Sequence, residues 1–214
     1  MMKGAIFDLD GTLVYSVGLH AEAWKKLFLT QEITLTDEEL REQSGMKNLT
    51  FIKNVLERRG ISGLDQTSLS EQKDEMVLTL LKTKPASVFP GARQLLELLR
   101  SKCIKLALAT SASRETALIL GKEVIGFFDY LIFSGDVTRG KPDPEIFLKA
   151  AEGLGLTSNE CIVFEDAESG VEAAKRGGFF CIAKDNGPGQ DLSKADQIID
   201  SYEPDMLIKL FCET

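Results

Sequence analysis

The sequence predicts an α/β fold: a mostly parallel sheet with helices on both faces, interrupted by an inserted all-helical domain. Short apolar runs alternate with helical patterns over most of the chain, which is typical of parallel sheets. From about Ser16 to Lys84, by contrast, we find helical patterns and no convincing strand. The length of 214 residues and the hydrophobic fraction of 43% suffice for a substantial core.

The strands are predicted from five short apolar runs that end in polar or glycine-containing turns. These runs are residues 4–9 (GAIFDL), 105–109 (KLALA), 130–133 (YLIF), 161–164 (CIVF) and 179–183 (FFCIA). Runs that are apolar throughout indicate strands buried on both sides, so helices must cover both faces of the sheet.

The helices are predicted from apolar faces and from residues typical of helix ends. Residues 92–100 carry three leucines on one helical face, and residues 144–153 follow Asp143 as N-cap, with Pro144 at the first helical position. Three serine or threonine residues precede a glutamate by three positions, which marks helix starts. The pairs are Thr36 with Glu39, Ser68 with Glu71, and Ser169 with Glu172, the last interpreted as a full capping box whose helix ends at Gly177-Gly178.

These patterns divide the chain into two domains. The motif Phe89-Pro90-Gly91, preceded by Pro85, returns the chain to alternating strands and helices. We therefore predict that residues 1–15 and 85–214 form the sheet domain, and that residues 16–84 form the inserted helical domain.

Composition and charge narrow the function classes. With 33 acidic against 25 basic residues the net charge is -8, which argues against a nucleic-acid partner or an anionic membrane surface. No apolar run approaches the ~18 residues of a membrane span, and Asp8 and Asp10 interrupt any signal-peptide core. We expect a cytoplasmic enzyme or binding domain, and a monomer because nothing indicates a large exposed apolar patch.

Several chemistries are excluded by the cysteines and the single histidine. The four cysteines contain no C-x-x-C pair, and Cys161 and Cys181 fall in apolar runs typical of buried thiols. His20 is the only histidine, which excludes a three-histidine metal site and argues against a hydrolytic triad. Any metal must therefore be held by oxygen.

Carboxylates gather where the predicted strands end. Asp8 and Asp10 are two residues apart on an extended segment, so their side chains point to the same side. Glu165 and Asp166 end the fourth strand. Because the carboxyl ends of parallel strands share one edge, where open α/β folds bind ligands, the four acids are expected in one crevice.

Repulsion among four acids would raise their pKa values unless cations intervene. Lys141, in the motif GKPDP, can supply one positive charge, and a divalent metal can supply more. An all-oxygen site suits Mg²⁺ better than zinc. Thr110-Ser111 ends the second strand at the same edge. The alternative is that these acids are only helix caps and solvated turn residues.

Four ordered motifs match a known family. FDLDGTL, LALATS, GKPDP and VFEDAESG, in this order and spacing, resemble the haloacid dehalogenase-like superfamily over essentially the whole chain. Within it, the sequence is most similar to the β-phosphoglucomutase-like and sugar-phosphatase branch. The resemblance implies a Rossmann-like core and identifies the inserted helices as a small cap domain over the active site.

The resemblance also implies catalytic roles. Asp8 would be the nucleophile that takes the phosphoryl group as an aspartyl-phosphate. Asp10 would protonate the leaving oxygen and then deprotonate the attacking water or sugar hydroxyl. Thr110, with a backbone amide near Ser111, would hydrogen-bond the transferring oxygens, and Lys141 would neutralise their charge.

A magnesium site is implied as well. Mg²⁺ would be held by Asp8, the Asp10 carbonyl, Asp166 and Glu165, and would offset the repulsion between carboxylate and phosphate. Gly11 suits a tight turn close to the phosphate; the alternative is that it is an ordinary loop glycine.

Residues of the cap bear on the substrate. In β-phosphoglucomutases the cap presents a histidine, an arginine and a lysine, and His20 and Lys73 match two of them. Asn48 stands where the arginine would be, and an asparagine carries no charge to hold a phosphate. Lys47 could compensate in part.

We therefore predict a Mg²⁺-dependent phosphatase of small, sugar-like phosphomonoesters. The alternative is a β-phosphoglucomutase that interconverts β-glucose 1-phosphate and glucose 6-phosphate. A non-catalytic phosphate-binding module should lack Asp8 or Asp10, and both are present. A dehalogenase needs no Mg²⁺, so the acids after the fourth strand and Lys141 favour phosphoryl chemistry.

Overall fold

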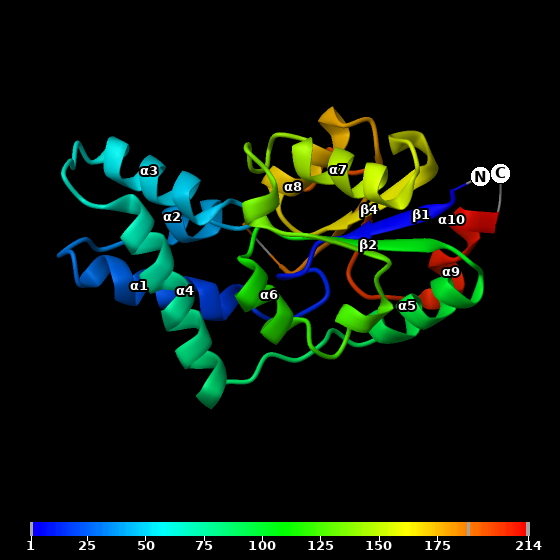
Figure 1. Ribbon diagram of the computed structural model, residues 1–214, viewed down its shortest axis with the longest axis horizontal. Helices are drawn as coiled ribbons and strands as arrows, with labels where there is room; N and C mark the ends of the chain where they lie inside the picture. The colour runs from blue at the N-terminus through cyan, green and yellow to red at the C-terminus, as the bar shows by residue number, and fades with distance from the viewer. Residues whose placement is uncertain (1, 188, 213–214) are drawn as a thin grey trace.

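The computed structural model describes residues 2–187 and 189–212, and its centre is a six-stranded parallel sheet of order β3-β2-β1-β4-β5-β6 (Figure 1). The strands are β1 (Gly4–Phe7), β2 (Lys105–Ala109), β3 (Tyr130–Ile132), β4 (Cys161–Glu165), β5 (Phe180–Lys184) and β6 (Gln197–Ile199). The predicted parallel sheet is confirmed, and the bounds of the five predicted strands differ from the observed ones by at most two residues.

The first strand lies in the middle of the sheet, between β2 and β4. Phe7, its last residue, is aligned with Leu108 on one side and Phe164 on the other. The residues that follow β1, β2 and β4 therefore leave the sheet side by side. The sequence does not predict β6, because its three residues are partly exposed at the sheet edge and form no apolar run.

Helices cover both faces of the sheet (Figure 1). One face is covered by α5 (Ala92–Ser101), α6 (Arg114–Leu120), α9 (Pro204–Leu207) and α10 (Lys209–Cys212), the other by α7 (Glu145–Leu154) and α8 (Glu168–Arg176). Three short 3-10 helices lie in the connections: η1 (Ile125–Phe127), η2 (Ser134–Asp136) and η3 (Ser158–Glu160). Leu95, Leu96 and Leu99 of α5 are fully buried, as their spacing predicts.

The helical insert lies beyond the carboxyl ends of the strands (Figure 1). It consists of α1 (Val17–Leu29), α2 (Asp37–Glu42), α3 (Asn48–Arg58) and α4 (Gln66–Thr83). Its own core is built around Trp24, Phe28 and Phe51, whose ring centroids lie 4.8–6.1 Å apart. None of the helices in the described ranges combines the length and the apolarity that crossing a membrane requires.

Most predicted helix starts lie close to the observed ones. Thr36 and Glu39 mark a predicted helix start, and they form a reciprocal cap of α2. α7 begins one residue later than predicted, because Pro144 is its N-cap. α4 begins two residues before Ser68, since the Asp65 carboxylate caps it by accepting two backbone N–H groups.

The predicted capping box of α8 is wrong. Ala167 is the N-cap of this helix, and Ser169 already lies in its first turn. The Ser169 hydroxyl instead donates to the Ser44 carbonyl of the insert at 3.0 Å. Glu172 pairs with Arg176, one turn further along the helix, at 2.8 Å. The serine therefore connects the two parts of the chain rather than starting a helix.

Candidate active site

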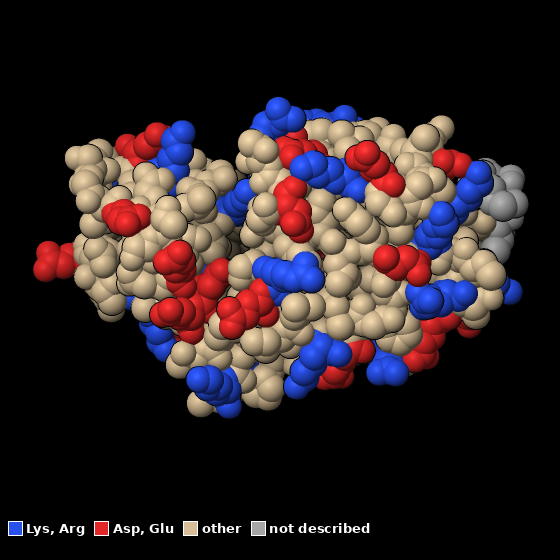
Figure 2. Space-filling view, in the orientation of Figure 1, with Lys and Arg blue, Asp and Glu red and all other residues tan. Residues whose placement is uncertain are grey.

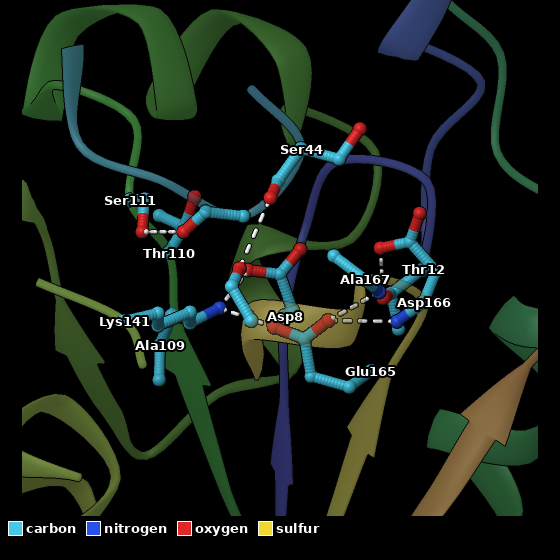
Figure 3. A network of polar contacts seen from close by, with 12 residues as sticks. Asp8, Thr12, Ser44, Ala109, Thr110, Ser111, Lys141, Glu165, Asp166 and Ala167 are labelled. Atoms are coloured by element: carbon cyan, nitrogen blue, oxygen red, sulfur yellow. Dashed lines mark hydrogen bonds and ion pairs between the residues drawn. The ribbon is translucent and has the colours of Figure 1, made fainter. Parts of the chain in front are cut away.

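Side chains from neighbouring strand ends meet at the carboxyl edge of the sheet (Figure 3). Asp8 follows β1, Thr110 follows β2, and Asp166 follows Glu165, the last residue of β4. Asp8 is 3% exposed, Glu165 is fully buried and Asp166 is 6% exposed. Since the three strands are adjacent, the fold forces these carboxylates into one cluster shielded from water.

The ammonium of Lys141 lies inside this cluster (Figure 3). Its Nζ donates to Asp8 Oδ1 at 2.6 Å and to Glu165 Oε1 at 2.5 Å. The other Glu165 oxygen accepts the backbone N–H groups of Asp166 and Ala167, at 2.7 and 2.9 Å. Both oxygens of Glu165 are thus engaged, one of them with Lys141. This arrangement favours a role in holding Lys141, and the metal-ligand role that the resemblance implies for Glu165 stays a prediction.

The cluster holds more negative than positive charge. Burial raises the pKa of Asp8 to about 8, because Lys141 offsets only part of the desolvation while Glu165 and Asp10 add repulsion. Burial and the charges of Glu165 and Asp8 also raise the pKa of Asp166. For Lys141, burial would lower the pKa, but Asp8 and Glu165 outweigh burial and raise it.

This excess of negative charge fits a hard divalent cation. The two oxygens of Asp166 accept from neutral donors, the Thr12 hydroxyl and the Asn186 amide, both at 3.2 Å. Within the described residues, no three His, Cys, Asp or Glu side chains are grouped so that they alone could hold a metal. A ligand set would therefore comprise Asp8 and Asp166, completed by the Asp10 carbonyl and water, and Mg²⁺ favours such sets with few carboxylates.

Gly11 is required where it stands. Its φ of +79° lies in the left-handed region, and a Cβ at this position would overlap the Asp166 carboxylate. Its carbonyl accepts from Asn186 Nδ2 at 2.7 Å. The turn after β1 therefore passes directly against Asp166, which distinguishes Gly11 from an ordinary loop glycine.

A hydrogen-bonded chain runs from the helical insert to Asp10. Lys73 Nζ lies 2.7 Å from His20 Nδ1, and His20 Nε2 lies 2.8 Å from Asp10 Oδ1. An ammonium only donates, so Nδ1 accepts and the Nε2 proton is donated to Asp10. Burial would raise the pKa of Asp10, but His20 and the Ser16 hydroxyl outweigh it and lower the pKa to about 2.

Thr110 and Ser111 differ in their contacts. The Thr110 hydroxyl accepts the Ala112 N–H at 3.1 Å, so its own proton remains to be donated. The Ser111 hydroxyl donates to the Gly45 carbonyl at 2.7 Å and thereby holds a loop of the insert. The Ser111 hydroxyl is thus engaged, and the expected donation to phosphate by a backbone amide near Ser111 stays a prediction.

A cavity of about 40 Å³ lies between the strand ends and the insert, where Figure 2 shows a hollow between the two parts. Its walls include Asp8, Asp10, Thr110 and Ser111 from the sheet domain and His20, Asn48 and Lys73 from the insert. Asn48 Nδ2 donates to Asp74 Oδ1 at 2.9 Å, and Lys73 Nζ lies 3.6 Å from the same oxygen. The lysine charge is therefore already shared with an acid of the insert.

Lys47 does not contribute its charge to this cavity. Its Nζ donates to the Val137 carbonyl of the sheet domain at 2.9 Å. Among the described residues that line the cavity, Lys73 is the only lysine or arginine. The compensation expected from Lys47 is therefore not provided in this arrangement.

Three residues of the site are not singled out by the sequence analysis: Thr12, Asp74 and Asn186. Thr12 lies within FDLDGTL, so the motif itself could have indicated it. Asp74 and Asn186 lie in a helix and in a turn after β5, where only the tertiary fold shows their partners.

Comparisons with known proteins agree with these motifs. A family model described as haloacid dehalogenase-like hydrolase matches residues 2–178. The chain is 35% identical over 182 residues to a phosphorylated carbohydrates phosphatase of Thermotoga maritima, covering 83% of this chain and 82% of the relative. It is 29% identical over 204 residues to a β-phosphoglucomutase of Bacillus subtilis, covering 92% of this chain and 89% of that relative.

Solved structures extend the likeness to the whole fold. A hydrolase from Pseudomonas syringae superimposes with a TM-score of 0.87 at 30% identity over all of both chains. A β-phosphoglucomutase from Clostridium difficile gives a TM-score of 0.86 at 26% identity, covering 100% of this chain and 96% of the other. The predicted fold class, a Rossmann-like core with an inserted helical cap, is confirmed.

Proposed function

The chain belongs to the haloacid dehalogenase-like hydrolases, and on this premise we propose that it is a Mg²⁺-dependent phosphatase of small, sugar-like phosphomonoesters. The observation that supports this most directly is the grouping of Asp8, Asp10 and Lys141. Both aspartates line one cavity, and Lys141 Nζ lies 2.6 Å from Asp8 Oδ1. A nucleophile, an acid–base group and a fixed cation are thus available to one bound phosphate.

Phosphoryl transfer would begin at Asp8. A carboxylate oxygen attacks phosphorus, the P–O bond to the sugar breaks, and Asp10 gives the departing oxygen a proton. Water then attacks the aspartyl-phosphate and gives its proton to Asp10, and the P–O bond to Asp8 breaks to release inorganic phosphate. A bound Mg²⁺, held by Asp8, the Asp10 carbonyl and Asp166, would supply positive charge that offsets the repulsion between carboxylate and phosphate.

The fixed donors would stabilise the charge of the transferring group. Lys141 is held by Glu165, at 2.5 Å, so its ammonium needs no reorganisation during the reaction. The Thr110 hydroxyl retains a proton to donate, and the Ser111 backbone amide would join it.

Asp10 must change its protonation state between the two steps. With His20 bound at 2.8 Å its pKa is lowered to about 2, so it is ionised and suited to take a proton from water. For the first step it must carry a proton. Loosening of the contact with His20 would favour the protonated form of Asp10. Without that contact, the effect of burial, which raises the pKa of Asp10, is less opposed.

The cap residues favour a phosphatase over a mutase. A mutase must hold a second phosphate while the sugar reorients, and this requires a free cation on the cap. Lys73 is engaged with His20 and Asp74, and the neutral Asn48 is bonded to Asp74 as well. A β-phosphoglucomutase remains the second candidate, because His20 and Lys73 match that branch and relatives of that name are similar over most of the chain.

A phosphate-release screen tests the proposal. The purified protein is incubated with sugar phosphates, nucleotides and phosphoglycolate, with Mg²⁺ or with excess chelator. We expect inorganic phosphate from sugar phosphates with Mg²⁺, none with chelator, and recovery when Mg²⁺ is restored. Asp8→Asn serves as the control for contaminating phosphatases. Full activity in chelator would contradict the metal requirement, and no release from any sugar phosphate would contradict the substrate class.

A further inference from the structure

Asn186, in the turn after β5, makes polar contacts that the proposed mechanism does not use. We propose that Asn186 is a positioning residue that orients Asp166 toward a divalent cation. The inference rests on the metal site of the proposed function and concerns a residue outside the four sequence motifs.

Asn186 connects the two segments from which the metal ligands would come. Its Nδ2 donates to Asp166 Oδ2 at 3.2 Å and to the Gly11 carbonyl at 2.7 Å. A side-chain amide nitrogen carries two protons, so both hydrogen bonds form at once. The acid that follows β4 is thereby fixed to the turn that follows β1, which carries Asp8 and the Asp10 carbonyl.

Lys184 determines which way the amide faces. Its Nζ donates to Asn186 Oδ1 at 3.0 Å, and Lys184 as a residue is only 6% exposed. The same ammonium donates to the carbonyls of Asp185 and Asp200, at 3.2 and 3.0 Å, and lies 4.6 Å from the centre of the Phe89 ring. With Oδ1 held by this anchored donor, Nδ2 must face Asp166 and Gly11.

The chemistry of the amide suits this position. An aspartate would still accept from Lys184, but it could not donate to the Asp166 carboxylate or to the Gly11 carbonyl. A lysine or arginine would pair with Asp166 and compete with a cation for its charge. Asn186 and Thr12 instead hold the two oxygens of Asp166 with neutral groups, so the hydrogen bonds that orient the carboxylate bring no positive charge onto it.

The expected effect is a loss of metal affinity. Removal of a group that orients a metal ligand typically weakens metal binding by about 10–100-fold. Because Asn186 is exposed at the surface, water can replace part of its hydrogen bonding. We therefore expect about a tenfold loss, at the lower end of that range.

The experiment measures metal binding without substrate. The metal-free full-length protein is titrated with Mn²⁺, which prefers the same oxygen ligands as Mg²⁺, and the free ion is followed by electron paramagnetic resonance with Mg²⁺ as competitor. Asn186→Ala and the similarly sized Asn186→Leu should each raise the dissociation constant about tenfold. Asn159→Ala is the matched control, because the side chain of this exposed asparagine, among the described residues, is hydrogen-bonded only to the Thr157 hydroxyl of a distant turn.

The outcomes separate this role from the proposed function. Dissociation constants within about twofold of the wild-type value in both Asn186 variants would overturn the proposal. So would a fall of the metal-free unfolding temperature by more than about 4 °C, because the fold rather than Asp166 would then have changed. A wild-type protein that binds no Mn²⁺ would overturn the metal site and this role together. Since no substrate is present, an absence of phosphatase activity leaves the result intact.

Discussion

Lys141 Nζ lies 2.6 Å from Asp8 Oδ1 in a region where neither residue is more than 3% exposed. In a buried ion pair of this kind each charge neutralises the other. Removing one partner destabilises the fold, because the other charge is then buried and unpaired. Glu165 shares the same ammonium, at 2.5 Å. Lys141 therefore compensates two carboxylates at once, and the stability of the sheet edge depends on it.

The first prediction concerns that dependence. Lys141→Met should lower the free energy of unfolding by about 3–5 kcal/mol, since it leaves Asp8 and Glu165 without their cation. Urea denaturation of the metal-free protein at pH 9, above the raised pKa of Asp8, measures this difference. The control is Lys149→Met, because Lys149 is 43% exposed and pairs with Glu145 at the surface, where a loss of about 1 kcal/mol or less is expected. Equal losses of unfolding free energy in the two variants would show that the buried pair stabilises the protein no more than a surface pair does.

A second prediction follows from the raised pKa of Asp8. Burial raises this pKa from 3.8 to about 8, so between these values the folded protein binds a proton that the unfolded chain releases. The free energy of unfolding of the metal-free protein should therefore fall as the pH rises through this window, by up to ~1.4 kcal/mol per pH unit. Urea denaturation from pH 5 to 9 in chelator tests this. Asp8→Asn should flatten the dependence, and an undiminished slope in that variant would assign the proton to another group.

The third prediction separates the two aspartates. Asp8→Asn should abolish the phosphoenzyme, since an amide oxygen is a far weaker nucleophile than a carboxylate. Asp10→Asn should slow both formation and breakdown of the phosphoenzyme by ~10²–10⁴-fold, the usual contribution of general acid–base catalysis. Rapid quench with a labelled sugar phosphate, followed by peptide mapping, identifies the phosphorylated residue. Label on a residue other than Asp8 would refute the assignment.

The sequence predicts local features of this chain better than its tertiary contacts. Apolar runs locate five strands because buried parallel strands are apolar throughout, whereas the short, partly exposed β6 gives no such signal. The motif spacing also places Asp8, Lys141 and Asp166 at one sheet edge. It does not show that Glu165 is bonded to Lys141 and to two backbone amides, or that Ser169 connects to the insert. Such contacts depend on how segments distant in sequence are packed.

The bond between Asn48 and Asp74, 2.9 Å long, bears on the choice between phosphatase and mutase. A cation at position 48 could hold the second phosphate of a bisphosphorylated intermediate, with hydrogen bonds worth about 1.5–3 kcal/mol. Without this cation, the affinity for the bisphosphorylated intermediate is lower by roughly one to two orders of magnitude. The intermediate would then leave before it could reorient, and the aspartyl-phosphate would be open to water.

The last prediction follows from this loss of affinity. Incubation with β-glucose 1-phosphate, Mg²⁺ and a trace of the bisphosphate should yield mainly inorganic phosphate. The double substitution of Asn48→Arg with Asp74→Asn should shift the products toward glucose 6-phosphate, because the new guanidinium is not neutralised by the acid beside it. Asn48→Arg alone should shift them less, since Asp74 remains to pair with the introduced charge. Product analysis by enzymatic assay of glucose 6-phosphate and phosphate decides between the outcomes. Glucose 6-phosphate as the dominant product of the wild-type protein would establish the mutase instead, and another cation of the cap would then have to hold the second phosphate.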